Sequence, residues 1–315
     1  MSIGEFNLPS AAVIRMLAVM EEALQNVFSM FLIMMASYLL MKKEPYPVEV
    51  VNTLVFHFFL PVTTFYSIAG LKEVPVGELL LLMAAGFGST TIIVLLAVLM
   101  ARTCGFKDGF RKTFLLGAAY GNHVFLGVPI CYAFLGERGT VLALFLALGG
   151  YFFLYGIGIY IMTGRVTPAA LFKNPLFLAM SAGFLCVALS FPIPALLSHT
   201  FSLMHTATFP LSMMVVGGGL KLRFFLDSSR ILPVLYTAAL KLIVSPAVAW
   251  GIALALGLSR EQLAVCILQA ATPTAVLVTI FSVQYEADPV FSNAIVSLTT
   301  LACMGVIPVL FFLLK

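Results

Sequence analysis

Charged side chains are scarce in this chain of 315 residues: they make up 10% of it, whereas a soluble domain carries about 25%. Hydrophobic residues reach 62%, and the mean hydropathy is +1.10. This composition excludes an ordinary soluble domain and predicts a membrane protein. The net charge of +4 comes from basic residues scattered through short loops, which is typical of topology signals. We therefore expect no nucleic-acid partner.

Cysteine is also sparse, and its five positions form neither a CxxC pair nor a cluster with histidine. This spacing predicts no disulfide framework and no metal site. A GxxxxGK[ST] phosphate loop is absent, so the sequence gives no support to coupling by ATP. The apolar stretches lack the paired acids, metal motif or positioned nucleophile of an enzyme, so we expect neither catalysis nor a cofactor.

Apolar runs long enough to cross about 30 Å of hydrocarbon occur ten times along the chain and predict an all-α polytopic membrane protein. They lie near residues 21–41, 49–70, 77–101, 113–135, 140–163, 175–192, 195–220, 231–257, 262–284 and 289–314. Residues 1–20 mix Pro9, Ser10 and Arg15 with apolar residues. They predict a short interfacial segment, and no signal peptide is expected because the cleavage pattern is missing.

The loops predict the orientation. Loops that follow odd-numbered spans carry eleven basic residues, and the opposite side carries five. The positive-inside rule then places the richer side in the cytoplasm. We expect a multi-pass protein of the cell (inner) membrane with both termini on the non-cytoplasmic side.

Two spans are interrupted by polar, proline-containing breaks. These are GNHVFLGVP at 121–129 and QAATPTAV at 269–276. A spanning helix can unwind at mid-depth only where protein or a water-filled cavity supplies hydrogen-bond partners. Paired breaks in corresponding places of two halves are typical of a transport site. The alternative is a pair of proline kinks stabilised by neighbouring helices.

The two halves of the chain resemble one another. Pro61 precedes Pro129 by 68 residues, and Pro210 precedes Pro273 by 63. Five spans separate the copies, and an odd number turns the second copy upside down. The sequence thus predicts two inverted repeats of five helices, with spans 4 and 9 broken.

Five segments, in order, resemble the auxin efflux carrier family, which includes plant auxin exporters and bacterial carriers of dicarboxylates such as malate and malonate. The segments are FHFFLPVTTFYSIAG, GNHVFLGVPICYAFLGERG, LFKNPLFLAMSAGFL, KLIVSPAVAWGIALALGL and ATPTAVLVTIFSVQYEADPVFSNAIVSLTTL. Together they place the resemblance over Glu22 to Lys315.

The resemblance implies a fold related to the bile acid sodium symporters. Residues 21–70 and 175–221 (spans 1, 2, 6 and 7) would form a scaffold domain that mediates a homodimer. Residues 77–163 and 231–315 (spans 3–5 and 8–10) would form a transport domain, in which the broken spans cross. Substrate would bind beside the crossing, and the transport domain would move against the scaffold like an elevator.

The breaks themselves favour an anion, because the N-terminus of a half-helix exposes unpaired N–H groups and a positive dipole end. We expect these donors at Leu126 to Val128, just before Pro129, and a similar start at Pro273. The candidate substrate-binding residues are Asn122, His123, Pro129, Tyr155, Lys241, Gln269, Thr272, Pro273 and Thr274. The amide of Asn122 could donate to substrate or brace the crossover, and the hydroxyls of Thr272 and Thr274 could reach a carboxylate.

Lys241 lies about ten residues into a span, where an ammonium costs roughly 2.5 to 3.5 kcal/mol or more. Its counter-group could be an anionic substrate, a carbonyl at a break or the negative end of a half-helix. Among the histidines, His123 is the candidate for proton coupling, whereas His205 is expected to be satisfied within its helix. Tyr155 resembles by position a polar aromatic residue of the family's fifth span, and packing is its alternative role.

These observations together predict a secondary active transporter of a small carboxylate in the lipid bilayer, working by alternating access. Two alternatives remain: a non-transporting receptor or channel on the same fold, and a sodium-coupled organic anion symporter. The lack of acids within the spans disfavours sodium, so coupling to protons or to the membrane potential is preferred.

Overall fold

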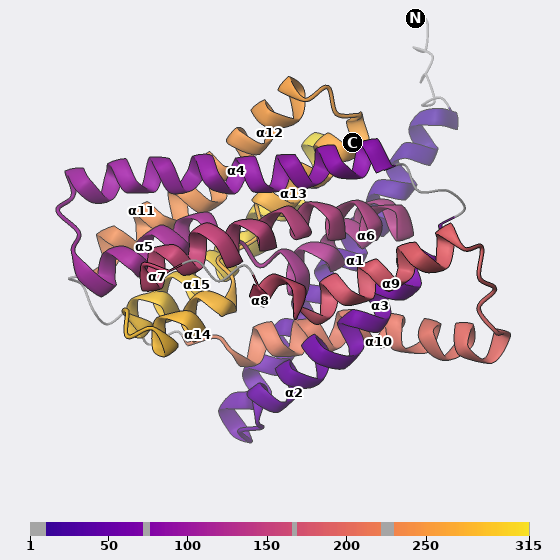
Figure 1. The fold of residues 1–315 in the computed structure, drawn as a ribbon, viewed down its shortest axis with the longest axis horizontal. Coiled ribbons are helices and arrows are strands. Elements are labelled where there is room, and N and C mark those ends of the chain that lie inside the picture. The colour runs from indigo at the N-terminus through magenta and orange to yellow at the C-terminus, as the bar shows by residue number, and fades with distance from the viewer. Residues whose placement is uncertain (1–10, 72–75, 166–168, 222–229, 315) are drawn as a thin grey trace, which may run out of the picture.

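The computed structural model describes residues 11–71, 76–165, 169–221 and 230–314, and within these ranges every regular element is a helix (Figure 1). Six helical stretches are long and apolar enough to cross a membrane: Leu24–Lys43, Val48–Ala69, Val76–Thr103, His123–Thr163, Ile231–Ala255 and Pro289–Leu314. Large apolar side chains such as Leu32, Leu95 and Ile243 lie exposed on the outside. This surface suits lipid, so the protein is a polytopic helical membrane protein. The count of ten spans stays a prediction.

One group of helices contains the two segments expected to form the scaffold. Its members are α1 (Ala11–Lys43), α2 (Val48–Leu54), α3 (Leu60–Ala69), α9 (Pro175–Ala188) and α10 (Ala195–Gly218). Gly217 of α10 lies directly on the backbone of α1, since a Cβ there would be 2.0 Å from the Met34 carbonyl oxygen. Ser37 Oγ donates to the Met214 carbonyl at 2.7 Å. Small residues and such interhelical bonds hold membrane helices together.

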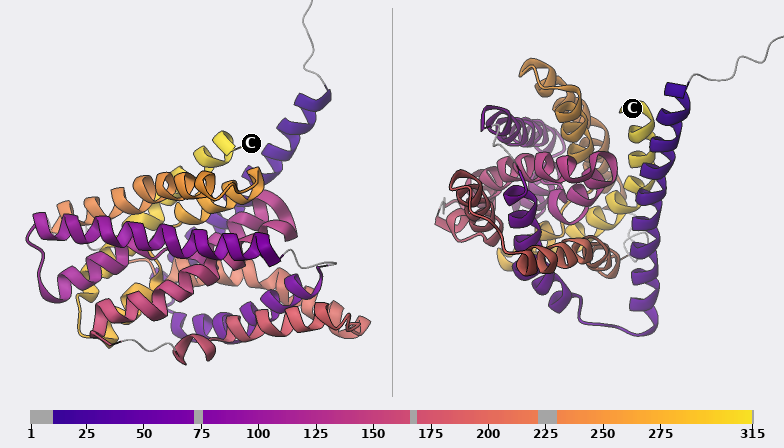
Figure 2. Two further views of the ribbon diagram at one scale, coloured as in Figure 1. Left: turned by 45° about the horizontal axis from the view of Figure 1, so that its top comes forward. Right: turned by 90° about the vertical axis from the view of Figure 1, so that its right-hand side faces the viewer.

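The second group contains the broken spans. Its members are α4 (Val76–Thr103), α5 (Asp108–Ala119), α6 (Val128–Phe153), α7 (Ile159–Thr163), α11 (Ile231–Ala239), α12 (Ser245–Ala255), α13 (Arg260–Ala270), α14 (Val276–Gln284) and α15 (Pro289–Leu314). The short helix α8 (Ala169–Phe172) lies between the halves of the chain. The side view in Figure 2 shows α1 at one edge of the molecule, beside the yellow α15.

α6 contains a chain reversal at Gly136, whose backbone has φ 60° and ψ −145°. Only glycine adopts such a conformation readily. A Cβ on Gly139 would lie 2.0 Å from the carbonyl oxygen of Cys131, although residues eight apart in a straight helix are separated by about 12 Å. The stretch His123–Thr163 is therefore two helices that pack on each other, and Glu137 lies at the turn between them.

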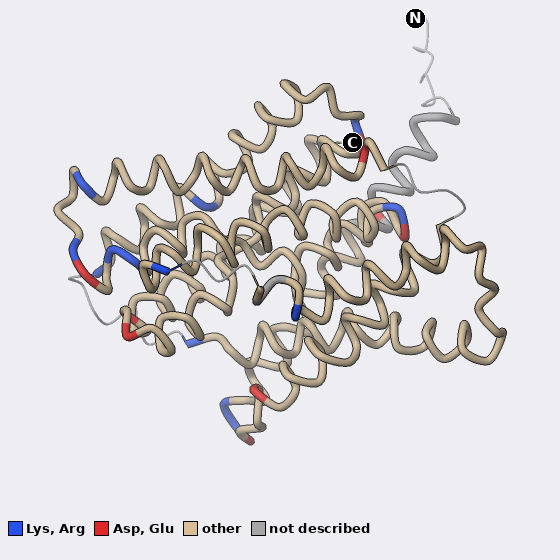
Figure 3. Tube along the Cα trace, viewed as in Figure 1, with Lys and Arg blue, Asp and Glu red and all other residues tan. Residues whose placement is uncertain are grey.

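α1 starts at Ala11 and runs without interruption to Lys43. Residues 1–10, which include Pro9 and Ser10, lie outside the described residues, so the interfacial segment expected for residues 1–20 stays a prediction. Charged residues gather at helix ends and in the connections (Figure 3). This arrangement leaves the long helices largely apolar, as a hydrocarbon environment requires, with the buried Lys241 as a charged residue inside the stretch Ile231–Ala255.

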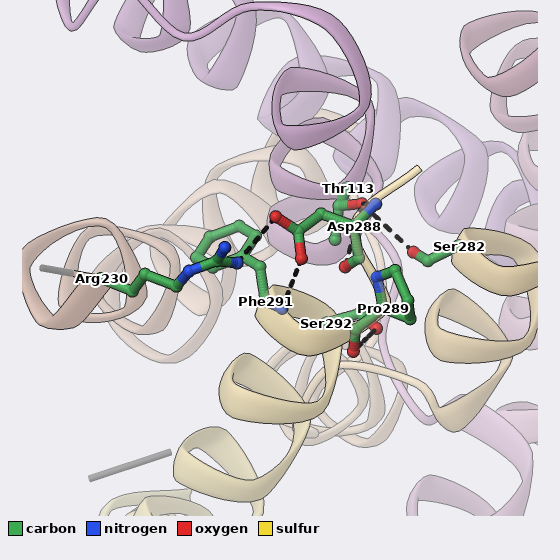
Figure 4. A network of polar contacts seen from close by, with 7 residues as sticks. All are labelled: Thr113, Arg230, Ser282, Asp288, Pro289, Phe291 and Ser292. Atoms are coloured by element: carbon green, nitrogen blue, oxygen red, sulfur yellow. Dashed lines mark hydrogen bonds and ion pairs between the residues drawn. The ribbon is translucent and has the colours of Figure 1, made fainter. Parts of the chain in front are cut away.

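A polar network joins the ends of four helices (Figure 4). Asp288 accepts the N–H of Phe291 at 2.9 Å and thereby caps α15, and it pairs with Arg230 at 2.7 Å. Its own N–H donates to Thr113 Oγ1 of α5 at 3.0 Å, and Thr113 lies 3.2 Å from Ser282 Oγ of α14. The network connects α5 and α14, which flank the two breaks, with the starts of α11 and α15.

Candidate functional site

The two breaks meet at the centre of the second helix group. Gly121 and Thr274 form an antiparallel β-bridge. The N–H of Asn122 donates to the Pro273 carbonyl at 2.7 Å, and the N–H of Ala275 donates to the Tyr120 carbonyl at 3.1 Å. Each break thus supplies backbone partners to the other, which is what unwinding inside a membrane requires. The two interruptions form one crossing and are not independent proline kinks.

The free donors of the first break lie closer to Asn122 than expected. Residues His123–Gly127 form a π-helical turn, in which Leu126 and Gly127 donate to the Asn122 carbonyl at 3.3 and 3.0 Å. Val128 donates to the His123 carbonyl. The prediction of unpaired N–H groups at Leu126 to Val128 is therefore wrong, because the wide turn consumes them.

The N–H groups of Val124 and Phe125, in contrast, find no acceptor among the described residues. Pro129 lies in the first turn of α6, beyond the π-helical turn. The positive end of this half-helix is therefore at Val124 and Phe125.

The second half-helix begins at Val276 and not at Pro273, whose carbonyl is used in the bridge. Thr272 Oγ1 donates to the Gln269 carbonyl and Thr274 Oγ1 to the Gly117 carbonyl, both at 2.7 Å. Both hydroxyl protons are thereby committed to the protein. The N–H groups of Val276 and Leu277 have no acceptor among the described residues, so the positive end of α14 lies there.

The residues with these free N–H groups line one small cavity. Its walls are Asn52, Tyr120, Gly121, Asn122, His123, Val124, Phe125, Tyr151, Ala275, Val276, Leu277 and Ile280. The side chain of Asn122 is buried, and its Nδ2 has no hydrogen-bond partner among the described residues. The cavity volume is about 20 Å³, which holds about one water molecule. Residues at both half-helix N-termini and the unpartnered amide of Asn122 therefore belong to the wall of one cavity.

Lys241 lies behind this cavity. It is fully buried in the π-helical segment Leu240–Val244, and its Nζ donates to the carbonyl of Ala270 at 2.8 Å. Ala270 is the last residue of α13. Two of the counter-groups expected for Lys241, a carbonyl at a break and the negative end of a half-helix, are therefore the same group. A Cβ on Gly121 would lie 2.8 Å from Nζ. Gly121 thus separates the lysine from the cavity.

Gln269 and His123 join the two breaks through their side chains. His123 Nδ1 donates to Gln269 Oε1 at 3.1 Å, and Gln269 Nε2 donates to the Ala143 carbonyl at 3.5 Å. Gln269 is fully buried and packs on Gly127, where a Cβ would be 2.2 Å from Oε1. His123 itself lines the cavity, while Gln269 orients it from behind.

Tyr155 does not line the cavity. It lies in the π-helical segment Leu154–Gly158, and its hydroxyl accepts a hydrogen bond from Asn174 Nδ2 at 3.3 Å. Its ring stacks on Tyr151 with centroids 6.1 Å apart, and Tyr151 is the aromatic residue of this helix that reaches the cavity.

Three wall residues with polar side chains, Asn52, Tyr120 and Tyr151, were not among the sequence candidates. Asn52 had a visible signal, because it is an amide inside an apolar span. Tyr120 directly precedes the first break, whereas nothing in the local sequence distinguishes Tyr151 from Tyr155.

A polytopic helical protein in which two broken helices cross at a buried polar cavity has the architecture of a membrane transporter. Comparison with known families agrees, since the chain matches the family described as membrane transport protein over residues 22–170 and 164–311. The chain belongs to this family, which confirms the family resemblance seen in the motifs.

Two archaeal relatives carry transporter names without an assigned substrate. The uncharacterized transporter MJ1031 of Methanocaldococcus jannaschii is 26% identical over 277 residues, covering 82% of this chain and 88% of the relative. An uncharacterized transporter of Methanothermobacter thermautotrophicus is 25% identical over 268 residues, covering 81% and 87%.

Proposed function

We propose that the protein is a secondary active transporter of small carboxylates that works by elevator-like alternating access in the cell membrane. In this proposal ten spans form two inverted repeats of five helices, and both termini lie on the non-cytoplasmic side. Spans 1, 2, 6 and 7 form a scaffold domain that dimerises, and spans 3–5 and 8–10 form the transport domain. The meeting of the two matched family ranges at residues 164–170, between these halves, supports the repeat.

The single observation that carries the anion is the convergence of two half-helix N-termini on one cavity. The unpaired N–H groups of Val124, Phe125, Val276 and Leu277 belong to residues of its wall, as does the unpartnered amide of Asn122. Helix N-termini favour negative charge through aligned N–H groups and the dipole. No acidic side chain belongs to the cavity wall formed by the described residues. A carboxylate is the substrate group that matches this set of donors.

The charges around the crossing are arranged as a dipole. The C-terminal end of α13 points its Ala270 carbonyl at Lys241, while the N-terminal ends of the following half-helices border the cavity. The lysine neutralises the negative helix end and leaves the positive ends to the ligand. Through the thin backbone of Gly121 its own charge adds to the attraction for an anion.

The cavity also explains why domains would have to move. A volume of about 20 Å³ accepts a water but no carboxylic acid, so the site must widen to load. Asn52 comes from α2 of the proposed scaffold, and the remaining wall residues come from the proposed transport domain. Sliding of one group against the other opens the cavity at this boundary.

The proposal is tested in two steps with purified protein. A thermal-shift screen against mono- and dicarboxylates should show stabilisation, and the best ligand should then show saturable counterflow in proteoliposomes. An Asn122→Ala variant should lose both effects, with Ser181→Ala, on the exposed face of α9, as the matched control. Stabilisation only by neutral or cationic ligands contradicts the anion. Ligand binding without counterflow would instead indicate a receptor, and sodium-dependent counterflow would indicate a symporter.

A further inference from the structure

A second polar cluster lies away from the crossing, at the chain reversal in α6. Glu137 Oε1 is 3.0 Å from Nε2 of His205, and Ser67 Oγ donates to Glu137 Oε2 at 3.4 Å. Ser67 belongs to α3 and His205 to α10. Glu137 therefore connects the turn of one helix group with two helices of the other.

This contact is unusual among the ion pairs that the described residues form. Arg138 pairs with Glu261 of α13, and Arg230 pairs with Asp288; both pairs stay within the proposed transport domain. The Glu137–His205 pair crosses from the transport domain to the scaffold. In an elevator mechanism such a contact must break whenever the transport domain moves.

His205 is placed as a buried titratable group and not as a satisfied helix residue. Its side chain is 5% exposed, and neither ring nitrogen makes a hydrogen bond among the described residues, so Nε2 meets Glu137 at ion-pair distance only. The rings of Tyr66, Tyr132 and Phe209 surround it, with centroid distances of 5.7, 5.8 and 5.0 Å. Glu137 is the only described side chain that faces the imidazole with a charge at ion-pair distance, so the expectation for His205 from the sequence is corrected.

Protons reach the pair from water. The side chain of Glu137 is 56% exposed and lines a cleft of about 430 Å³ between the two helix groups. The other titratable or charged groups that face the pair are Tyr66 of α3, Glu78 of α4, and Tyr132 and Arg138 of α6. Glu78 accepts from Gln262 Nε2 at 3.0 Å, and Arg138 is held by Glu261, so neither competes directly for His205.

We propose that Glu137 and His205 form a protonation-dependent latch that holds the scaffold and the transport domain together in this conformation. The proposal rests on the proposed transport function. The latch is strongest when the imidazole carries its proton and the carboxylate has lost its own. Its release as the imidazole loses its charge makes the domain movement depend on pH at the cleft.

The sign of the effect follows from the contacts. The contact with His205 holds the pKa of Glu137 below its usual range, so acid protonates the carboxylate only as pH falls through that lowered value. Above that value the carboxylate stays charged, and loss of the imidazole proton with rising pH removes the attraction at the 3.0 Å contact and weakens the latch.

Histidine footprinting with diethyl pyrocarbonate tests the latch without any substrate. His205 labelling is measured by mass spectrometry relative to His199, which lies exposed on the same helix. In the wild type the ratio should rise with pH, because loss of the imidazole proton releases the pair. Glu137→Gln should raise the labelling ratio about fivefold at the acidic end of the pH range and abolish its pH dependence. A fivefold change corresponds to the loss of a half-exposed ion pair worth ~1 kcal/mol.

Glu261→Gln is the matched control, because it removes an ion pair at the same end of the molecule that stays within one domain. It should leave the His205 ratio unchanged. Ser67→Ala provides a milder second variant that should raise the ratio in the same direction. An identical ratio and pH profile in wild type, Glu137→Gln and Ser67→Ala would overturn the latch.

Counterflow in proteoliposomes separates this result from the proposed function. If the latch gates transport, Glu137→Gln flattens the pH profile of counterflow while Glu261→Gln keeps it. A footprinting response in a protein that shows no counterflow with any carboxylate supports the latch and refutes the transport proposal. Counterflow with the wild-type pH profile retained in Glu137→Gln overturns the latch and leaves the transport proposal intact.

Discussion

Replacing Lys241 by methionine tests whether the buried cation contributes to anion binding. Methionine matches the length of the aliphatic stem and removes the charge. The change leaves the Ala270 carbonyl without the donor it has at 2.8 Å, a cost of about 1–3 kcal/mol. It also removes the desolvation cost of a buried ammonium, which is of similar size. We therefore expect a folded protein with a melting temperature within a few degrees of the wild type.

The effect on the ligand is larger and can be worked out from the position of Gly121. Nζ lies 2.8 Å from where a Gly121 Cβ would be, and the Gly121 backbone separates it from the cavity. Two unit charges about 7 Å apart at an effective dielectric constant of about 20 attract by ~2 kcal/mol, and we take this value for an anion in the cavity. Lys241→Met should then weaken carboxylate binding roughly 30-fold.

The assay is a calorimetric titration of wild type, Lys241→Met and Lys241→Arg with the best ligand of the thermal-shift screen. The arginine variant keeps the charge and should retain most of the affinity if its longer side chain is accommodated. Equal affinity in wild type and a folded methionine variant would refute the electrostatic role. Lys241 would then be a structural tie to the end of α13.

Three further changes probe other contacts. Gly121→Ala places a methyl group 2.6–3.0 Å from Thr272 Oγ1, Lys241 Nζ and His123 Cε1. It should therefore reduce counterflow about tenfold or more. Gly77→Ala is the control and should be neutral in the same assay, because a Cβ there meets no atom within 4 Å. Tyr151→Phe should change ligand affinity in titration while Tyr155→Phe leaves it unchanged, because Tyr151 alone of the two lines the cavity; the reverse order would contradict the assigned wall. Asp288→Ala removes the cap of α15 and the ion pair with Arg230. It should lower the free energy of unfolding by about 1–2 kcal/mol, measured by thermal unfolding. The ligand affinity of the protein that remains folded should not change.

The sequence predicts the chemistry of the crossing better than its hydrogen bonds. Polar breaks in apolar spans could be read from composition, because hydrocarbon leaves few reasons to place Asn122 or Thr272 at mid-depth. The helix starts could not, because the π-helical turn at His123 gives no distinct sequence signal. The bridge between Gly121 and Thr274 moreover joins residues about 150 positions apart. Proline marked the breaks but not the first helical residue of α14.

Long-range packing also decided the roles of several side chains. Thr272 and Thr274 have the right chemistry for a carboxylate, yet their protons go to carbonyls of Gln269 and Gly117. Tyr151 and Tyr155 are one turn apart and differ only in what surrounds them. His205 is a single polar residue in a helix, and its carboxylate partner comes from a turn far away in the sequence. Such distinctions require the tertiary structure.

The bridge between the two breaks has a consequence for how the protein is made. The N–H of Asn122 finds its acceptor only in Pro273, and at about 5–20 residues per second this carbonyl is synthesised on the order of ten seconds later. During that interval the first break lacks the backbone partners that the second break provides to Asn122 and Tyr120, and a translocon, a chaperone or water must supply substitutes. A truncated first half would carry this exposed break permanently, which makes it a substrate for membrane quality control.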